Sequence, residues 1–130
     1  MNSPFKGKTG VIRLINAFGY SMHGLSAAWQ HESAFRQVAL LACVGAGLAF
    51  LLPFATWGTA MIVASHLLCV VAELLNSAIE AAVDHTSLEF HVLAKRAKDL
   101  GSAAQFVCLV NLTFMWVFAI CTLPLASIPR

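Results

Sequence analysis

The chain has 130 residues, 59% of them hydrophobic and 11% charged, with a formal net charge of +2 and a mean hydropathy of +0.79. Because about a quarter of the residues in an ordinary water-soluble domain are charged, this composition excludes such a domain. We expect a single integral membrane domain over residues 1–130, and we expect no nucleic-acid partner.

The N-terminal segment, about residues 5–30, combines apolar residues at helical spacing with positive charge. The apolar set is Val11, Ile12, Leu14, Ile15 and Phe18, and the basic set is Lys6, Lys8 and Arg13. This pattern predicts an amphipathic helix on the membrane surface. Gly19 and Gly24 predict a bend before the first transmembrane helix.

Three apolar segments follow. No Asp, Glu, Lys or Arg occurs between residues 37 and 72 or between residues 100 and 129. A run of about 20 apolar residues suffices to cross a hydrocarbon core of about 30 Å. Pro53 interrupts the first run, so we predict an all-α membrane protein with transmembrane helices at about 32–52, 57–84 and 98–123.

Basic residues are distributed unevenly between the connections. They cluster in the N-terminal segment and in the second loop, which carries Lys95, Arg96 and Lys98, whereas the turn at Pro53 has none. The positive-inside rule then predicts a cytoplasmic N-terminus and second loop, with the C-terminus on the opposite side.

The second span ends in "AELLNSAIEAAVD", residues 72–84, which places polar residues in an apolar helix. At 100° per residue, Glu73, Asn76, Glu80 and Asp84 fall within an arc of about 80°. We refer to these four residues as the acidic stripe. A carboxylate one turn inside the apolar boundary, as we expect for Glu73, costs roughly 2.5–3.5 kcal/mol on insertion scales and is a functional candidate.

Three carboxylates on one stripe repel each other, so cations are expected beside them. The second loop supplies lysines and arginine, and oxygen ligands of this kind suit Mg²⁺ carried by nucleotide phosphates. The sequence contains neither GxxxxGK[ST] nor GxGxxG, so a conventional soluble nucleotide-binding fold is excluded.

At these residues the chain resembles the prokaryotic diacylglycerol kinases. "ELLNSAIEAAVD" is similar to the signature of that family, and "GLSAAWQHESAFRQ" (24–37) and "RAKDLGSAA" (96–104) are similar to two further blocks in the same order. The resemblance implies a homotrimeric kinase of the bacterial inner membrane with sites between protomers. It implies transfer of the γ-phosphoryl group of ATP, with Mg²⁺, to the hydroxyl of 1,2-diacylglycerol, which gives phosphatidic acid for phospholipid recycling.

The resemblance also implies roles for individual residues. Glu73 matches the catalytic base, Asn76 lies beside the reaction centre, and Glu32 and Glu80 match the metal-binding acids, which also contact the nucleotide. The remaining nucleotide-binding positions are Arg13, Tyr20, Glu89, Phe90, His91, Lys98 and Asp99. The lipid-binding positions are Arg13, Ala34, Phe35, Arg36, Glu73 and Ser102. Phe90 stands where the family commonly has Tyr, so a hydroxyl role there is lost.

Two other functions stay open at this stage. Undecaprenol kinase performs the same chemistry on a polyprenol, and a small ion-binding subunit of a channel or transporter could also carry intramembrane acids. His66, two turns before Glu73, is expected to be a neutral histidine hydrogen-bonded between helices, and "GAG" at 45–47 predicts a close approach of helices.

Overall fold

The computed structural model describes residues 10–86 and 89–123, and within these ranges it contains four helices. The chain divides into two compact units, the first ending at Glu32 and the second beginning at Ser33. The prediction of an all-α protein is confirmed for the described residues.

The first unit contains one helix, α1 (Val11–His31), which begins directly after Gly10 in the left-handed region at φ 72°. The helix runs without interruption through Gly19 and Gly24, so the predicted bend is wrong. A glycine in a helix costs only about 1 kcal/mol relative to alanine, and the flanking turns offset that cost. The apolar side chains of Val11, Leu14 and Phe18 are 72%, 72% and 68% exposed. The role of α1 as a surface helix stays a prediction.

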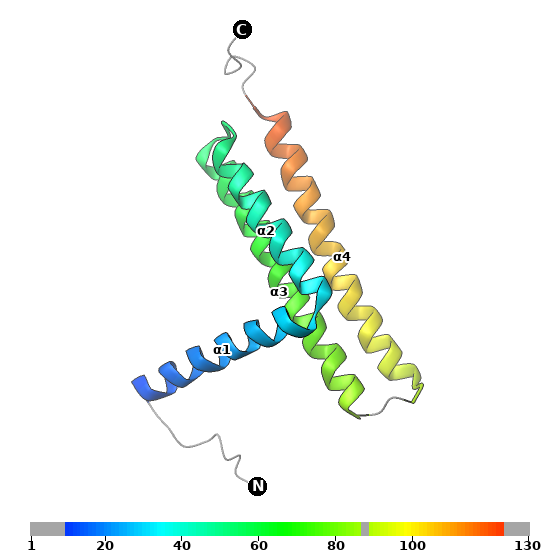
Figure 1. The fold of residues 1–130 in the computed structure, drawn as a ribbon. Coiled ribbons are helices and arrows are strands. Elements are labelled where there is room, and N and C mark those ends of the chain that lie inside the picture. Colours follow the sequence, from blue (N-terminus) through cyan, green and yellow to red (C-terminus); the bar gives the residue numbers. More distant parts are fainter. Residues whose placement is uncertain (1–9, 87–88, 124–130) are drawn as a thin grey trace. The chain divides into compact units, whose positions relative to one another are not determined.

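The second unit contains α2 (Ser33–Leu51), α3 (Thr56–Thr86) and α4 (Val92–Cys121), and α3 packs against both other helices. Figure 1 shows the three helices running side by side, with the C-terminal end of α3 near the N-terminal end of α4. All three are long and apolar enough to cross a membrane, as predicted.

The fourth helix begins at Val92 rather than near residue 98. The side chain of His91 caps it, because Nδ1 accepts a hydrogen bond of 3.2 Å from the backbone N–H of Leu93. The basic segment containing Lys95 and Lys98 is consequently helical. Its side chains therefore have fixed directions toward or away from α3.

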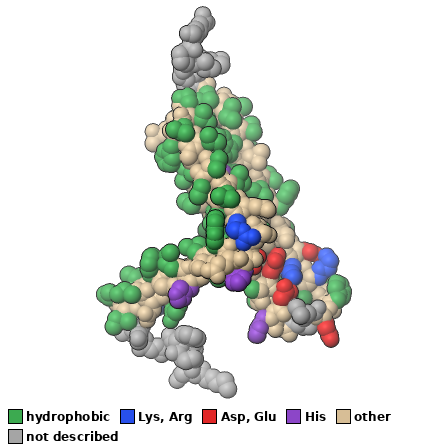
Figure 2. All heavy atoms as spheres, viewed as in Figure 1, with side chains coloured by type: hydrophobic (Ala, Val, Ile, Leu, Met, Phe, Trp, Pro, Cys, Tyr) green, Lys and Arg blue, Asp and Glu red, His purple; other side chains and the backbone are tan. Residues whose placement is uncertain are grey.

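The core of the second unit is small and is built by all three helices. One cluster contains Val38, Cys69 and Leu112, and another contains Ala49, Ile62 and Ala119. Most other large apolar side chains are exposed on the outside of these helices, and Figure 2 shows them covering much of the visible face. That distribution suits helices surrounded by lipid, where exposed apolar groups carry no penalty.

Polar contacts join α3 to α4 within the apolar part of the second unit. The indole N–H of Trp116 donates to Nε2 of His66 at 3.2 Å, and Asn111 Nδ2 donates to Ser65 Oγ at 3.2 Å. The expectation that His66 bonds between helices is confirmed. A Cβ added at Gly45 of α2 would overlap the His66 imidazole ring at the same Nε2 edge. The close helix approach predicted for residues 45–47 therefore occurs within one chain at Gly45.

Candidate active site

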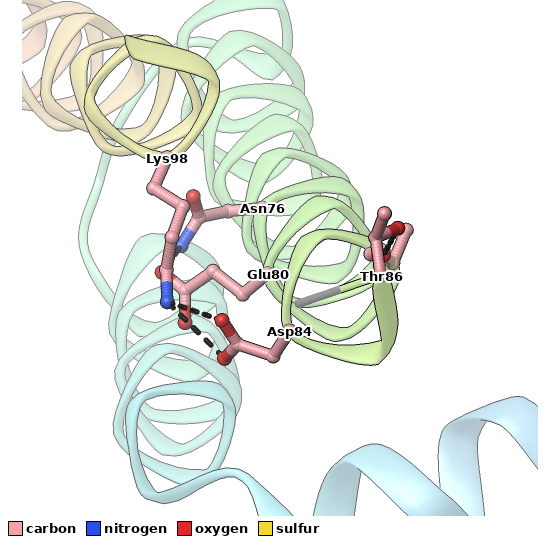
Figure 3. A network of polar contacts seen from close by, with 6 residues as sticks. Asn76, Glu80, Asp84, Thr86 and Lys98 are labelled. Atoms are coloured by element: carbon pink, nitrogen blue, oxygen red, sulfur yellow. Dashed lines mark hydrogen bonds and ion pairs between the residues drawn. The ribbon is translucent and has the colours of Figure 1, made fainter. Parts of the chain in front are cut away.

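The last four turns of α3 present the acidic stripe toward α4. Asn76 Nδ2 donates a hydrogen bond of 3.1 Å to Oε1 of Glu80, one turn further along α3. Because the spacing is i, i+4, the two side chains lie one above the other on the same helix face. This bond holds Glu80 in a defined orientation (Figure 3).

A lysine from the opposite helix neutralises part of the stripe. Lys98 Nζ donates to both carboxylate oxygens of Asp84, at 3.0 and 3.1 Å, and Figure 3 shows its side chain reaching from α4 toward Asp84 and Glu80. An ammonium group here lowers the repulsion among the carboxylates of α3. Lys98 is thus one of the cations that the charge of the stripe requires.

A pocket of about 440 Å³ lies at this end of α3 and α4, a volume within the range of small-molecule sites. Five predicted nucleotide-binding residues line it together: Glu89, Phe90, His91, Lys98 and Asp99. Val83, Asp84, Ala94 and Lys95 complete the lining. On its wall Lys95 and Asp99 form an ion pair of 2.6 Å in which both side chains are 61% exposed. Charged groups of both signs therefore surround one concave surface.

Glu73 lies on the same stripe but deeper in the unit. Its residue is 4% exposed, and it precedes Glu80 by two turns, or about 10.5 Å along the helix axis. Gly101 of α4 packs against the intervening Asn76, because a Cβ added at Gly101 would overlap the Asn76 side-chain amide. The absence of a side chain at Gly101 therefore lets α4 close over the stripe next to Glu73.

The other predicted site residues are distributed over both units. Arg13, Tyr20 and Glu32 belong to the first unit, where Arg13 and Tyr20 are exposed on α1. Ala34 is exposed at the start of α2 and Ser102 is exposed on α4, whereas Phe35 is 5% exposed and packs within the chain. Arg36 is partly buried on α2, and its side chain interacts with another group of the protein.

No group of three or more His, Cys, Asp or Glu residues is close enough to hold a metal within residues 10–86 and 89–123. The metal site predicted from Glu32 and Glu80 thus draws on one residue from each unit. Its assembly stays a prediction.

Two residues of this site were not assigned a role from the sequence. Asp84 was recognised only as part of the stripe, although its position four residues after Glu80 could have indicated a partner for Lys98. Lys95 counts in the sequence only as one of the basic residues of the second loop, and the structure includes it in the pocket lining. Its spacing of four residues from Asp99 was the available signal.

Comparison with known proteins gives a consistent result. The family model described as prokaryotic diacylglycerol kinase matches residues 19–120. A diacylglycerol kinase of Pseudomonas aeruginosa is 54% identical over 114 residues, covering 88% of this chain and 93% of the relative. Relatives with the same name from Helicobacter pylori and Escherichia coli K12 are 47% and 41% identical, covering 87% and 83% of this chain and 88% of each relative.

The family match spans most of the chain and includes the acidic stripe, the pocket and all three long helices. The resemblance found in three sequence blocks is therefore confirmed over nearly the whole length. This chain belongs to the prokaryotic diacylglycerol kinase family, and it is a membrane kinase.

Proposed function

We propose that the chain transfers the γ-phosphoryl group of ATP to the free hydroxyl of 1,2-diacylglycerol, giving phosphatidic acid, and that Glu73 is the general base. The observation that carries this proposal is the pocket at the joined ends of α3 and α4, which gathers five predicted nucleotide-binding residues beside the stripe that leads to Glu73. Nucleotide and lipid would then approach the stripe from opposite ends.

Phosphoryl transfer needs a positioned nucleophile and neutralised phosphate charge more than it needs covalent chemistry by the protein. Lys98 supplies an ammonium at the pocket, already held by Asp84. Glu73 lies two turns before Glu80 on α3, where a lipid hydroxyl could reach it. The Glu73 carboxylate would accept the hydroxyl proton as the lipid oxygen bonds to the γ-phosphorus and the bond from that phosphorus to the β,γ-bridging oxygen breaks, which releases ADP. The two carboxylates of Glu73 and Glu80 are thus too far apart along α3 to share one role.

Mg²⁺ is the expected companion of ATP, and the residues present fit it. Mg²⁺ usually takes one or two protein carboxylates together with phosphate oxygens and water. Glu80 offers such a carboxylate, oriented by Asn76, and Glu32 is the second acid that the family resemblance implies. When bound there, Mg²⁺ would offset the negative charge of the phosphates.

The arrangement in the membrane is part of the same proposal. Because the basic residues gather at the joined ends of α3 and α4, we propose that this end faces the cytoplasm across a bacterial inner membrane. We further propose that α1 lies on the membrane surface and that three protomers assemble. Since one chain of three long helices offers little concave surface, residues such as Arg13, Tyr20 and Glu32 would complete sites between protomers.

Two alternatives differ in their predictions. Undecaprenol kinase uses the same base and nucleotide pocket, so only the lipid acceptor distinguishes it, and an assay with both lipids decides. An ion-binding subunit would place its acids near the bilayer midplane. The stripe instead occupies the end of α3 beside a charged pocket, which favours a kinase.

The test separates the two glutamates. Glu73→Gln keeps the pocket and Glu80, so an ATP analogue should still bind with Mg²⁺ while turnover falls by at least the 10²–10⁴-fold typical of lost general-base catalysis. Glu80→Gln should instead weaken nucleotide binding, and high Mg²⁺ should restore part of the activity. Calorimetric binding of a non-hydrolysable ATP analogue and a Mg²⁺ titration of the rate measure both effects.

Three results would count against the proposal. Loss of nucleotide binding in Glu73→Gln, with normal binding in Glu80→Gln, would exchange the two roles. ATP turnover by the wild-type protein that is independent of any lipid alcohol would argue against the lipid kinase assignment. Faster turnover with undecaprenol than with diacylglycerol would identify the polyprenol as the acceptor.

A further inference from the structure

Gln105 of α4 has a buried side-chain amide that forms no hydrogen bond with the other described residues. Its residue is 9% exposed, and neither Oε1 nor Nε2 has a hydrogen-bond partner within the described parts of the chain. A buried polar group without a hydrogen-bond partner destabilises the folded state. Asn111, two turns further along α4, differs because it donates to Ser65. Both polar atoms of the Gln105 amide are therefore left without a partner among the described residues.

The register between α3 and α4 places Gln105 opposite Glu73. Gly101 lies against Asn76, and Cys108 packs against the core cluster that contains Cys69. Gln105 follows Gly101 by one turn and precedes Cys108 by another. Since the helices are antiparallel, Gln105 faces the turn of α3 between Cys69 and Asn76, and the buried residue of that turn is Glu73.

The depth of Gln105 matches a particular part of a lipid. Gln105 follows Lys98 by seven residues, or about 10.5 Å along the axis of α4. Each interfacial layer of a bilayer is about 5–8 Å thick, given a total of about 40–45 Å and a core of about 30 Å. If the Lys98 ammonium contacts phosphates at the surface, the backbone of Gln105 lies about 3–5 Å below the inner boundary of this layer, close to where glycerol esters meet the acyl chains.

We propose that Gln105 determines specificity for the acceptor lipid, with its Nε2–H donating a hydrogen bond to an ester carbonyl of the diacylglycerol whose free hydroxyl lies at Glu73. The proposal rests on the proposed function, because it uses Glu73 as the residue that contacts the hydroxyl. A diacylglycerol has an ester carbonyl a few bonds from its hydroxyl. A polyprenol has no carbonyl, so the contact favours the diester over that competitor.

The test compares an ester lipid with its ether analogue. Wild type and Gln105→Met, which keeps the side-chain length and removes the donor, are assayed in mixed micelles with 1,2-dioleoylglycerol and with the corresponding dialkylglycerol. We expect Gln105→Met to lose about three- to tenfold in kcat/KM with the ester, the equivalent of one neutral hydrogen bond, and less than twofold with the ether. Wild type should prefer the ester by the same factor.

Asn111→Leu is the matched control, because it also replaces an amide of α4 by an apolar group. If Asn111→Leu affects activity at all, it should lower kcat/KM by the same factor with the ester and with the ether. An equal loss with both lipids in Gln105→Met, or no loss with either, would overturn the proposal. If Gln105→Met does not fold, the wild-type ratio decides, since equal kcat/KM for ester and ether refutes the carbonyl contact. Failure of wild type to phosphorylate either glycerolipid would instead refute the proposed function.

Discussion

Gly101→Ala should disturb the acidic stripe from the opposite helix without removing any chemical group. A Cβ at Gly101 would overlap the Asn76 side-chain amide, whereas the Asn76 Cα would be 3.6 Å away, an ordinary contact distance. The α3 backbone therefore has room and the Asn76 side chain does not. We expect Asn76 to rotate away from α4 and to lose its 3.1 Å hydrogen bond to Glu80.

The size of the effect follows from the bond that is lost. A hydrogen bond to a charged group contributes about 1.5–3 kcal/mol, which corresponds to roughly 10- to 100-fold in whatever equilibrium depends on the orientation of Glu80. Alanine is the better helix former by about 1 kcal/mol, so the helix itself gains stability. The variant should therefore fold and be defective in nucleotide handling.

The assay is ATP-dependent phosphorylation of diacylglycerol in mixed micelles over a range of Mg²⁺ concentrations, with thermal unfolding measured in the same detergent. Gly47→Ala is the control, because a Cβ at Gly47 meets nothing within 4 Å. If kcat/KM of Gly101→Ala equals that of wild type, or decreases no more than that of Gly47→Ala, the contact between Gly101 and Asn76 has no effect on activity. The reasoning would then be refuted.

Two further predictions concern a structural and an electrostatic role. His66→Leu removes the acceptor for the indole N–H of Trp116, so we expect a loss of about 0.6 kcal/mol in unfolding free energy, the typical intramembrane hydrogen-bond value, with turnover largely intact. A hundredfold loss of rate in a folded His66→Leu protein would contradict this assignment. Lys98→Met should weaken binding of MgATP more than Lys95→Met, because Lys98 bridges from α4 to Asp84 on α3 with its side chain 37% exposed, whereas Lys95 pairs with Asp99 one turn away on α4 with its side chain 61% exposed. Equal weakening in calorimetry would indicate only a diffuse electrostatic effect of both lysines.

Helix number, helix type and the stripe could be predicted from the sequence because they depend on local properties. Uninterrupted apolar runs can satisfy their backbone in lipid only as helices, and Pro53 separates the first two. The placement of Asn76 beside Glu80 follows from helical spacing alone. The prediction of a bend at Gly19 and Gly24 was wrong, because a single glycine weakens a helix without ending it.

The partners that meet between helices could not be predicted, because they depend on the register of one helix against another. Sequence separation does not indicate that Lys98 reaches Asp84, that Gly101 lies against Asn76, or that Gly45 makes room for His66. Each contact joins residues on different helices, and shifting one helix by a single residue would turn the side chains involved by about 100°. The residue types of the site were thus determined by the sequence, whereas the tertiary packing of α3 and α4 decided which charges meet and which amide is left without a partner among the described residues.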